Sequence, residues 1–508
     1  TYHWRFTRRP ADSQLTDADI LQSSSSSPEA SFVPDNDGRY DVALTVNDGN
    51  LDSEQDTVII TAISRPLADA GPDRTVGLGT EVILNGGDSR APQGNMLSYS
   101  WTFDPPASSQ AELSASQGQL TSFTPDVPGS YRIGLIVNDE FLSSDEHVVE
   151  ITAVNAFMRT FGGAGVDFGG PVHELEDGSG YVIGGESNSP SIVEYGDYDM
   201  VLIGTDPAGE AAWSQVYGGT GAEELWSLAV SPDGSFYLAG FSNSFGEDPG
   251  DAYLVETTDQ GGFVAQSVYG STDLDQAQVV LPTSDGGLIL AGYTQSPDLA
   301  PQGVNDANMY IIRRTAGGEI AWEKGYGGEL VEDAWGIAEK PDGSGFLIAG
   351  FSDSFADKSR GDAYLVEIDA NGNQLSSRTL GEPGLYDAFY DLRRIGDSNR
   401  YVAVGYTESL LDSNGDFYFV IISNDTPGEL RIEAEKSLGG SAYDEAHAVA
   451  NCDDGGFALV GTTRSYGHGS LNPDILLIKT DGTGNKKWQR TYGGAATDQA
   501  WSITQTLD

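Results

Sequence analysis

The feature that most constrains this chain is a sequence that recurs along its last two thirds. YGGTGAEELWSLAVSPDGSFYLAG, which begins at Tyr217, returns as YGGELVEDAWGIAEKPDGSGFLIAG from Tyr326. An aromatic residue or leucine followed by glycine-rich sequence recurs about every 52 to 58 residues, a period typical of a propeller blade or a solenoid coil. The seven positions are Phe161, Tyr217, Tyr269, Tyr326, Leu380, Leu438 and Tyr492.

Each repeat contains the pattern of four short strands. In the fourth repeat these are AWGIAEK from Ala334, GFLIAGFS from Gly345, DAYLVEID from Asp362 and QLSSRTL from Gln374. The connections PDGS and DANGN supply the Asp, Asn and Gly residues that hairpin turns need. Because a solenoid of parallel coils does not need reversals at this density, the sequence predicts an all-β fold that ends in a β-propeller.

The number of strands predicts how the propeller closes. AFMRTF from Ala156 resembles a fourth strand with nothing before it, six full sets follow, and AWSITQTLD from Ala500 resembles a lone first strand. These remnants fit one interrupted blade, so we expect seven blades, with six as the alternative. The chain then looks truncated at both ends.

The first part of the chain carries a different, longer repeat. YHWRF at residues 2–6 matches YSWTF at residues 99–103, and the alternating strand pattern from Ser31 returns from Ser122, about 91 positions later, which is the length of a small β-sandwich domain. Trp4 and Trp101 are then core residues. We expect a sandwich over 1–64 that lacks its first strands, a second sandwich over 65–154, and the propeller over 155–508.

Both parts resemble known families. ADAGPDRTVGLGTEVILNGGDSR from Ala68, with SYSWTF and GSYRIGLIVND, resembles PKD domains, an immunoglobulin-like family. The YGG and DGG pattern of residues 156–508 is similar to bacterial and archaeal surface-protein propeller repeats, although the fifth repeat lacks both glycine pairs. The first resemblance implies extracellular spacer or adhesion modules. The second implies a secreted or surface-anchored protein with no shared catalytic residues.

The charge of the chain excludes several partners. With 26 Lys and Arg against 77 Asp and Glu, the net charge of −51 repels nucleic acid and anionic membranes. An acidic excess of this size indicates either a saline or calcium-containing exterior or simply an acidic surface. The only cysteine, Cys452, forms no internal disulfide, and the five histidines show no metal or triad spacing.

Acidic residues recur at two places in the repeats. Pairs such as Glu332 with Asp333 stand before the first strand, where repetition favours hydrogen bonds that brace a loop over catalysis. A second set precedes the third strand, as structural caps or as calcium ligands. Asp412, Asn414 and Asp416 alternate in a glycine loop and are the candidate calcium ligands. The second set comprises Asp199, Asp251, Asp362, Asp416 and Asp474, with Asn308 in the third repeat.

Large rings open the first strand of several repeats. Trp226, Trp335 and Trp501, with Phe389 and His447 at equivalent positions, are the candidate binding residues, either stacking on a sugar or packing between blades. The loops between the second and third strands differ in every repeat. This difference indicates either a binding surface formed by these loops or neutral drift of solvent-exposed sequence.

These features predict a protein that binds rather than catalyses. We expect a non-catalytic extracellular or cell-surface protein for adhesion or structure, whose sandwich stalk carries a propeller head that binds a glycan, a protein or another copy of itself. The alternative is the targeting region of a larger secreted enzyme that acts on a polysaccharide. No cofactor is predicted beyond possible calcium, and neither nucleic acid nor direct membrane insertion is expected.

Overall fold

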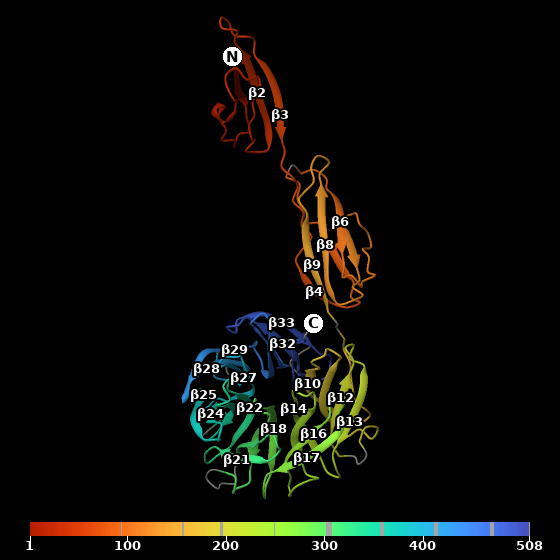
Figure 1. Cartoon of the computed structure of the whole chain (residues 1–508), viewed down its shortest axis with the longest axis vertical. Helices are drawn as coiled ribbons and strands as arrows, with labels where there is room; N and C mark the ends of the chain where they lie inside the picture. Colours follow the sequence, from red (N-terminus) through yellow and green to blue (C-terminus); the bar gives the residue numbers. More distant parts are fainter. Residues whose placement is uncertain are drawn as a thin grey trace. The chain divides into compact units, whose positions relative to one another are not determined.

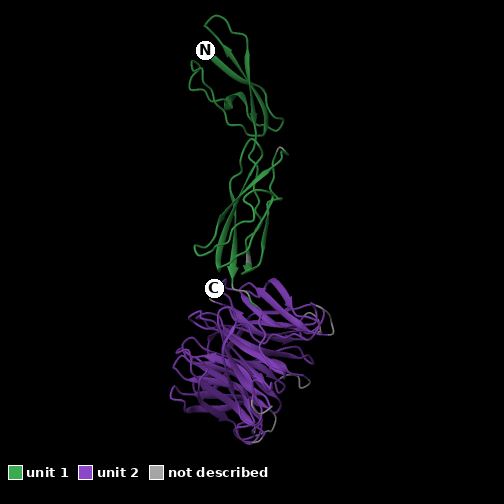
Figure 2. Ribbon diagram, turned by 90° about the vertical axis from the view of Figure 1, so that its right-hand side faces the viewer, with its two compact units in different colours: residues 1–157 green, residues 158–508 purple. Residues whose placement is uncertain are grey.

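The computed structural model is all-β, as the sequence predicts. It describes residues 1–92, 94–154, 157–193, 197–247, 249–300, 307–355, 360–410, 415–467 and 472–506. Within these residues there are 33 strands and one short 3-10 helix, η1 (Asp17–Asp19). The chain divides into two compact units, Thr1–Phe157 and Met158–Asp508 (Figure 2).

The chain begins with a three-stranded antiparallel sheet. Its order is β1 (Tyr2–Arg8), β2 (Gly38–Val46) and β3 (Asp56–Ala62). Tyr40 is fully buried at the centre, and no second sheet packs against these strands among residues 1–62. Trp4 is therefore only half-buried, which corrects its predicted role as a core residue.

Residues 74–154 form two sheets around one core. The first has the order β4-β9-β8-β6, with β4 parallel to β9, and the second pairs β5 with β7. Trp101 is buried here as predicted, and its indole Nε1 donates a 2.9 Å hydrogen bond to the Gly118 carbonyl. The strands are β4 (Arg74–Gly77), β5 (Val82–Asn85), β6 (Ser98–Asp104), β7 (Leu120–Phe123), β8 (Gly129–Asn138) and β9 (His147–Val154).

The same tyrosine hydrogen bond occurs in the sheet of residues 2–62 and in the two-sheet domain of residues 74–154. The Tyr40 hydroxyl donates to the Asn36 carbonyl at 3.0 Å, and the Tyr131 hydroxyl donates to the Val127 carbonyl at 2.9 Å. Each buried ring thus holds the turn that leads into its own strand, as tyrosine corners do in immunoglobulin-like domains. This matched pair is the structural counterpart of the repeat seen in the sequence.

The second unit contains six antiparallel sheets of four strands each, and in every sheet the strands follow one another in chain order. We call them sheets I to VI. The strands are β10 (Asp167–Glu174), β11 (Tyr181–Ser187), β12 (Asp199–Thr205) and β13 (Ala211–Tyr217) in sheet I; β14 (Glu223–Val230), β15 (Phe236–Ser242), β16 (Asp251–Thr257) and β17 (Phe263–Tyr269) in sheet II; β18 (Asp275–Pro282), β19 (Leu288–Thr294), β20 (Asn308–Arg314) and β21 (Ile320–Tyr326) in sheet III; β22 (Glu332–Glu339), β23 (Gly345–Ser352), β24 (Asp362–Asp369) and β25 (Gln374–Leu380) in sheet IV; β26 (Asp387–Arg394), β27 (Arg400–Thr407), β28 (Asp416–Thr426) and β29 (Glu429–Leu438) in sheet V; and β30 (Asp444–Asn451), β31 (Phe457–Thr463), β32 (Asp474–Thr480) and β33 (Lys486–Tyr492) in sheet VI.

Consecutive sheets are held together by separate hydrophobic cores. Between sheets I and II, for example, Met200 and Leu202 pack with Leu225, Phe236 and Tyr253. Four further clusters join the remaining neighbours from sheet II to sheet VI. The first strands face the middle of this unit, and the fourth strands lie toward its outside (Figure 1).

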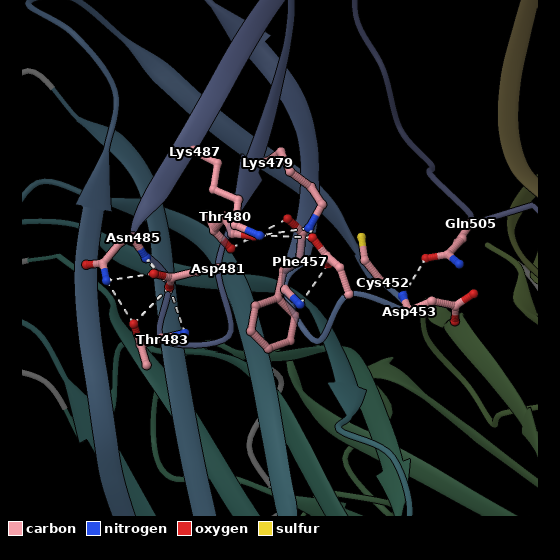
Figure 3. A network of polar contacts seen from close by, with 12 residues as sticks. Cys452, Asp453, Phe457, Lys479, Thr480, Asp481, Thr483, Asn485, Lys487 and Gln505 are labelled. Carbon is pink, nitrogen blue, oxygen red and sulfur yellow. Dashed lines mark hydrogen bonds and ion pairs between the residues drawn. The ribbon is translucent and has the colours of Figure 1, made fainter. Parts of the chain in front are cut away.

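The segments at the two ends of the second unit form no strand in the described residues 157–166 and 493–506, unlike the two remnant strands that the sequence predicts. The C-terminal segment instead bonds to two sheets. Ser502 Oγ accepts from the Val172 backbone of β10 at 3.2 Å, and Gln505 Oε1 accepts from the Asp453 backbone after β30 at 2.9 Å (Figure 3). A ladder needs one partner strand with alternating donors and acceptors, whereas here the partners belong to sheets I and VI.

Candidate functional site

Three of the predicted binding residues occupy one special position in their sheets. Trp226, Trp335 and His447 each lie where the pairing between the first and second strands shifts by one residue. Such a β-bulge leaves one residue outside the ladder and redirects its side chain. The same shift places Gln278 at this position in sheet III and Tyr390 in sheet V.

In the fifth repeat, the residue predicted to be equivalent to the tryptophans is wrong. Phe389, taken from the sequence as the equivalent of the tryptophans, is fully buried in the core between sheets IV and V. Its neighbour Tyr390 is the bulge residue. Tyr390 is the fourth residue of the strand that opens at Asp387, just as Trp335 is the fourth residue of the strand that opens at Glu332.

The bulge residues line a cavity of about 990 Å³ in the second unit. Its wall includes residues from the first strands of all six sheets and from the segment 499–505, which carries Trp501. Trp226 is 38% exposed and Trp501 is 47% exposed, so two large rings remain open to solvent. The wall also includes buried apolar side chains, among them Leu228, Val280 and Leu392.

The rings contact one another in a continuous series. Trp226 meets Trp335 at 5.9 Å between ring centroids and 90°, and Trp335 meets Tyr390 at 5.8 Å and 82°. Tyr390 then lies 6.4 Å from His447, which stacks on Trp501 at 4.1 Å and 8°. Side chains from three sheets and the C-terminal segment are thus linked to Trp226 of sheet II by edge-to-face and stacked contacts.

Carboxylates accompany this ring series, which we call the ring cluster (Trp226, Trp335, Tyr390, His447 and Trp501). Burial and the nearby Glu224 carboxylate raise the pKa of Glu186 to about 7. Burial likewise raises the pKa of Asp333 to about 7, although Gln278 Nε2 donates to Asp333 Oδ2 at 3.1 Å and favours the charged form. Glu186 lines the cavity itself.

Glu445 behaves differently because it has hydrogen-bond donors. Its carboxylate lies 3.4 Å from His447 Nε2 and accepts from the Tyr443 hydroxyl. Burial raises the pKa of Glu445, but these donors outweigh burial and leave the pKa below its usual value. The cavity wall therefore carries a fixed negative charge at Glu445 and a titrating one at Glu186.

The acid that opens the first strand accepts a backbone hydrogen bond from the preceding loop in five of the six sheets, as the repetition suggests, whereas Asp387 of sheet V accepts from the Thr407 and Ser409 hydroxyls. Glu332 is fully buried; its Oε2 accepts from the Gly328 backbone at 2.7 Å and its Oε1 accepts from the Ser352 hydroxyl at 2.7 Å. The equivalent backbone bonds join Asp167 to Gly163, Glu223 to Gly219, Asp275 to Ser271, Asp444 to Gly440 and Asp498 to Gly494.

The acid that opens each third strand lies near the brace of the following repeat. At Gly381, a Cβ atom would stand 2.6 Å from Asp362 Oδ1 and 2.7 Å from Asp387 Oδ2, so the two acids converge on one glycine. The same convergence occurs at six junctions, which we call the junction pairs. They are Asp199 with Glu223, Asp251 with Asp275, Asn308 with Glu332, Asp362 with Asp387, Asp416 with Asp444, and Asp474 with Asp498.

The candidate calcium ligands are mostly not described by the structure. Asp412 and Asn414 lie outside the described residues, and Asp416 belongs to a junction pair. Among the residues that the structure describes, no group of three or more His, Cys, Asp or Glu side chains is placed to hold a metal ion. The same residues include no helix long and apolar enough to cross a membrane.

Tyr390, Gln278 and Glu186 line the cavity but were not predicted from the sequence as site residues. Tyr390 and Gln278 have a usable signal, since each is fourth in its strand when counted from the opening acid. Glu186 has none, because it lies on the second strand of sheet I and only the three-dimensional arrangement brings it to the cavity.

A family comparison identifies part of the first unit. Residues 63–153 match the PKD domain model. No curated protein matches the chain.

Three solved structures show similarity. The PKD domain from the KIAA 1837 protein is 23% identical, with a TM-score of 0.17, over 20% of this chain and 99% of that one. The Neurospora crassa Pan2 WD40 domain is 9% identical, with a TM-score of 0.35, over 57% and 85%. A nucleoside hydrolase-related hypothetical protein from Saccharophagus degradans is 21% identical, with a TM-score of 0.17, over 18% and 26%, so this chain spans about a quarter of its length. With TM-scores this low, the likenesses carry no argument. The comparisons therefore support a PKD domain at residues 63–153, within an all-β chain.

Proposed function

We propose that this protein is a non-catalytic, extracellular or cell-surface binding protein in which the PKD-type modules serve as a stalk and the repeat region serves as the binding head. The observation that carries the proposal is the cavity wall, where bulges in the first strands present Trp226, Trp335 and Tyr390. Exposed rings in a cavity are a common means of recognition.

The proposal includes a finer statement of the fold. Sheets I to VI are blades of a β-propeller whose axis is the cavity, and the YGG and DGG repeats belong to the surface-protein type. Support comes from the chain-ordered sheets, from the cores between neighbours, and from the C-terminal segment bonded to both sheet I and sheet VI. An experimental structure of the repeat region tests the closure.

The bound partner in this proposal is a glycan, a surface protein or a second copy of the chain. Purified protein is applied to glycan arrays and whole cells, and its own association is measured by light scattering. A specific signal that falls when Trp226 is replaced by leucine supports the proposal. Inertness toward all three targets removes it.

The location outside the cell rests on the PKD match, since PKD domains are typically extracellular. Secretion of the protein by its native host, followed with an antibody, is the direct test. Calcium binding at Asp412, Asn414 and Asp416 also remains a proposal, and calorimetric titration with calcium tests it.

A second function keeps the same binding head but makes it an accessory of a larger secreted enzyme that acts on a polysaccharide. The repetition of Glu332-like braces favours this over catalysis by the repeats themselves, because these acids are engaged in backbone hydrogen bonds. Pull-down on insoluble polysaccharides distinguishes it, since the accessory function requires polysaccharide binding and self-association alone does not.

A further inference from the structure

We infer that the cavity of the second unit is a binding site for an organic ammonium group, held by the ring cluster together with Glu186 and Glu445. This inference rests on the proposal that the repeat region is a binding head, and it names the ligand class of the same site.

The rings are arranged as walls that meet at right angles. Trp335 stands at 90° to Trp226 and at 82° to Tyr390, with centroids less than 6 Å apart. Aromatic faces attract cations through their negative quadrupole, and several faces around one site form the cage used for quaternary ammonium groups. Trp226 and Trp501 are still 38% and 47% exposed, so ring surface remains for a ligand.

The charge on the wall suits a cation. Glu186 and Glu445 line the cavity, and Glu224 lies close enough to Glu186 to affect its pKa. Among the described lining residues, Arg393 is the one permanently cationic side chain. The net charge of −51 adds a long-range field that draws cations and repels anions.

A neutral sugar fits this wall less well. Sugar rings stack on one flat aromatic face flanked by hydrogen-bonding groups, whereas here Trp335 lies nearly perpendicular to both Trp226 and Tyr390. The one parallel pair, His447 with Trp501, uses its facing surfaces on itself at 4.1 Å. An ammonium group is compact and nearly spherical, so it is bound by perpendicular aromatic rings that surround it rather than by one open flat ring.

The ammonium group has two possible sources: a free small amine, and a lysine or methylated lysine on a protein partner. Both offer the same chemistry to the rings and carboxylates. Choline and tetramethylammonium represent the first source, and short peptides that carry lysine or trimethyllysine represent the second. A matched neutral probe is 3,3-dimethylbutan-1-ol, which has the shape of choline without its charge.

The experiment measures tryptophan fluorescence and heat on titration of the whole protein with each probe. We expect saturable binding of at least one ammonium probe and none of the neutral probe. The variant Trp226→Leu weakens binding about threefold to thirtyfold, as loss of one cation–π contact implies. Glu186→Gln weakens it as well and keeps all rings, which guards against a folding defect. Trp488→Leu, which removes a 44% exposed tryptophan outside the cavity wall, leaves binding unchanged.

Two results overturn the inference: equal binding of choline and its neutral analogue, or no binding of any ammonium probe well above millimolar concentration. Binding of the peptides alone keeps the inference and assigns the group to a protein. The proposed function fails separately. If the protein binds cells or glycans but binds none of the ammonium probes, the inference is wrong and the proposed function stands. If an ammonium probe binds but the protein binds no cell, glycan or second copy of itself, the inference stands and the proposed function fails.

Discussion

Replacing Asp251 by asparagine should stabilise the protein at neutral pH and not at acidic pH. Asp251 is only 4% exposed, and its Oδ1 and Asp275 Oδ2 converge on Gly270, where an added Cβ would collide with both. Burial raises the pKa of Asp251 to about 6, with the Asp275 and Glu247 carboxylates adding to the rise. Burial also raises the pKa of Asp275. The native junction thus favours a proton on the Asp251 side chain.

Proton linkage determines how the stability contributed by Asp251 changes with pH. The unfolded state releases the proton of this side chain near its ordinary pKa of 3.8, whereas the folded state holds it to about pH 6. Stability is therefore fully present below pH 3.8 and is lost between about pH 4 and 6. A rise of about two pKa units corresponds to about 3 kcal/mol at most, and screening and relaxation reduce this to about 1 to 3 kcal/mol.

Asparagine mimics the protonated acid without the charge. Sheet III already has Asn308 at this position, with its Oδ1 facing Gly327 as Asp251 Oδ1 faces Gly270. Asp251→Asn should therefore gain about 1 to 3 kcal/mol in unfolding free energy at pH 7 to 8 and little at pH 4.

The assay is urea denaturation followed by tryptophan fluorescence between pH 4 and 8. The matched control is Asp259→Asn, which changes the net charge equally at an exposed turn. A gain for Asp251→Asn that is independent of pH, or one no larger than the gain for Asp259→Asn, would refute the reasoning, because relief of the overall charge would then explain it.

Four further outcomes follow from the structure. Gly270→Ala, at φ +146 and between two carboxylates, should unfold more easily by several kcal/mol, whereas Gly494→Ala, which has nothing within 4 Å, should cost about 1 kcal/mol or less in thermal melts. Lys340→Met leaves the fully buried Glu367 without its partner at 2.5 Å and should cost about 3 to 5 kcal/mol in urea denaturation, with part recovered in Lys340→Met/Glu367→Gln. Tyr326→Phe removes the hydroxyl that donates to the Gly372 carbonyl at 2.8 Å and should lower unfolding free energy by about 1 kcal/mol without changing ammonium binding in calorimetry. Added sodium or calcium chloride should raise the melting temperature because both screen the charge of −51, and a melting temperature indifferent to ionic strength and to chelator contradicts this.

The strands of the repeats are predictable because local signals agree with each other. In the fourth repeat the second to fourth strands observed, β23, β24 and β25, begin at the predicted residues, and only the first strand starts two residues earlier, at Glu332. Alternating apolar residues fix the face of a strand, and Asp, Asn and Gly fix its turns. The sequence did not predict that this strand starts at Glu332, because a buried acid is not typical of the start of a strand. The hydrogen-bond partners of Glu332, the Gly328 backbone and the Ser352 hydroxyl, come from elsewhere in the fold.

The bulges are the part that the sequence pattern conceals. Period-two alternation assigns side chains to faces only while the ladder is unbroken, and one extra residue reverses the assignment after it. In sheet V the residue outside the ladder is Tyr390, as Trp335 is in sheet IV, although the sequence prediction gave that place to Phe389. The position of a bulge depends on pairing with the second strand, which lies about ten or more residues away in the chain.

Two positions of the first strand differ in how much they vary between repeats. The opening position of each first strand, and the equivalent position 498 of the C-terminal segment, is always Asp or Glu, and each described backbone bond there joins the acid to the loop before it. Three positions later the residue is Gly170, Trp226, Gln278, Trp335, Tyr390, His447 or Trp501. The residue that leaves the ladder thus presents different side chains to one cavity, and the proposed binding head requires such variation if its ligand has a single orientation in a pseudo-symmetric frame.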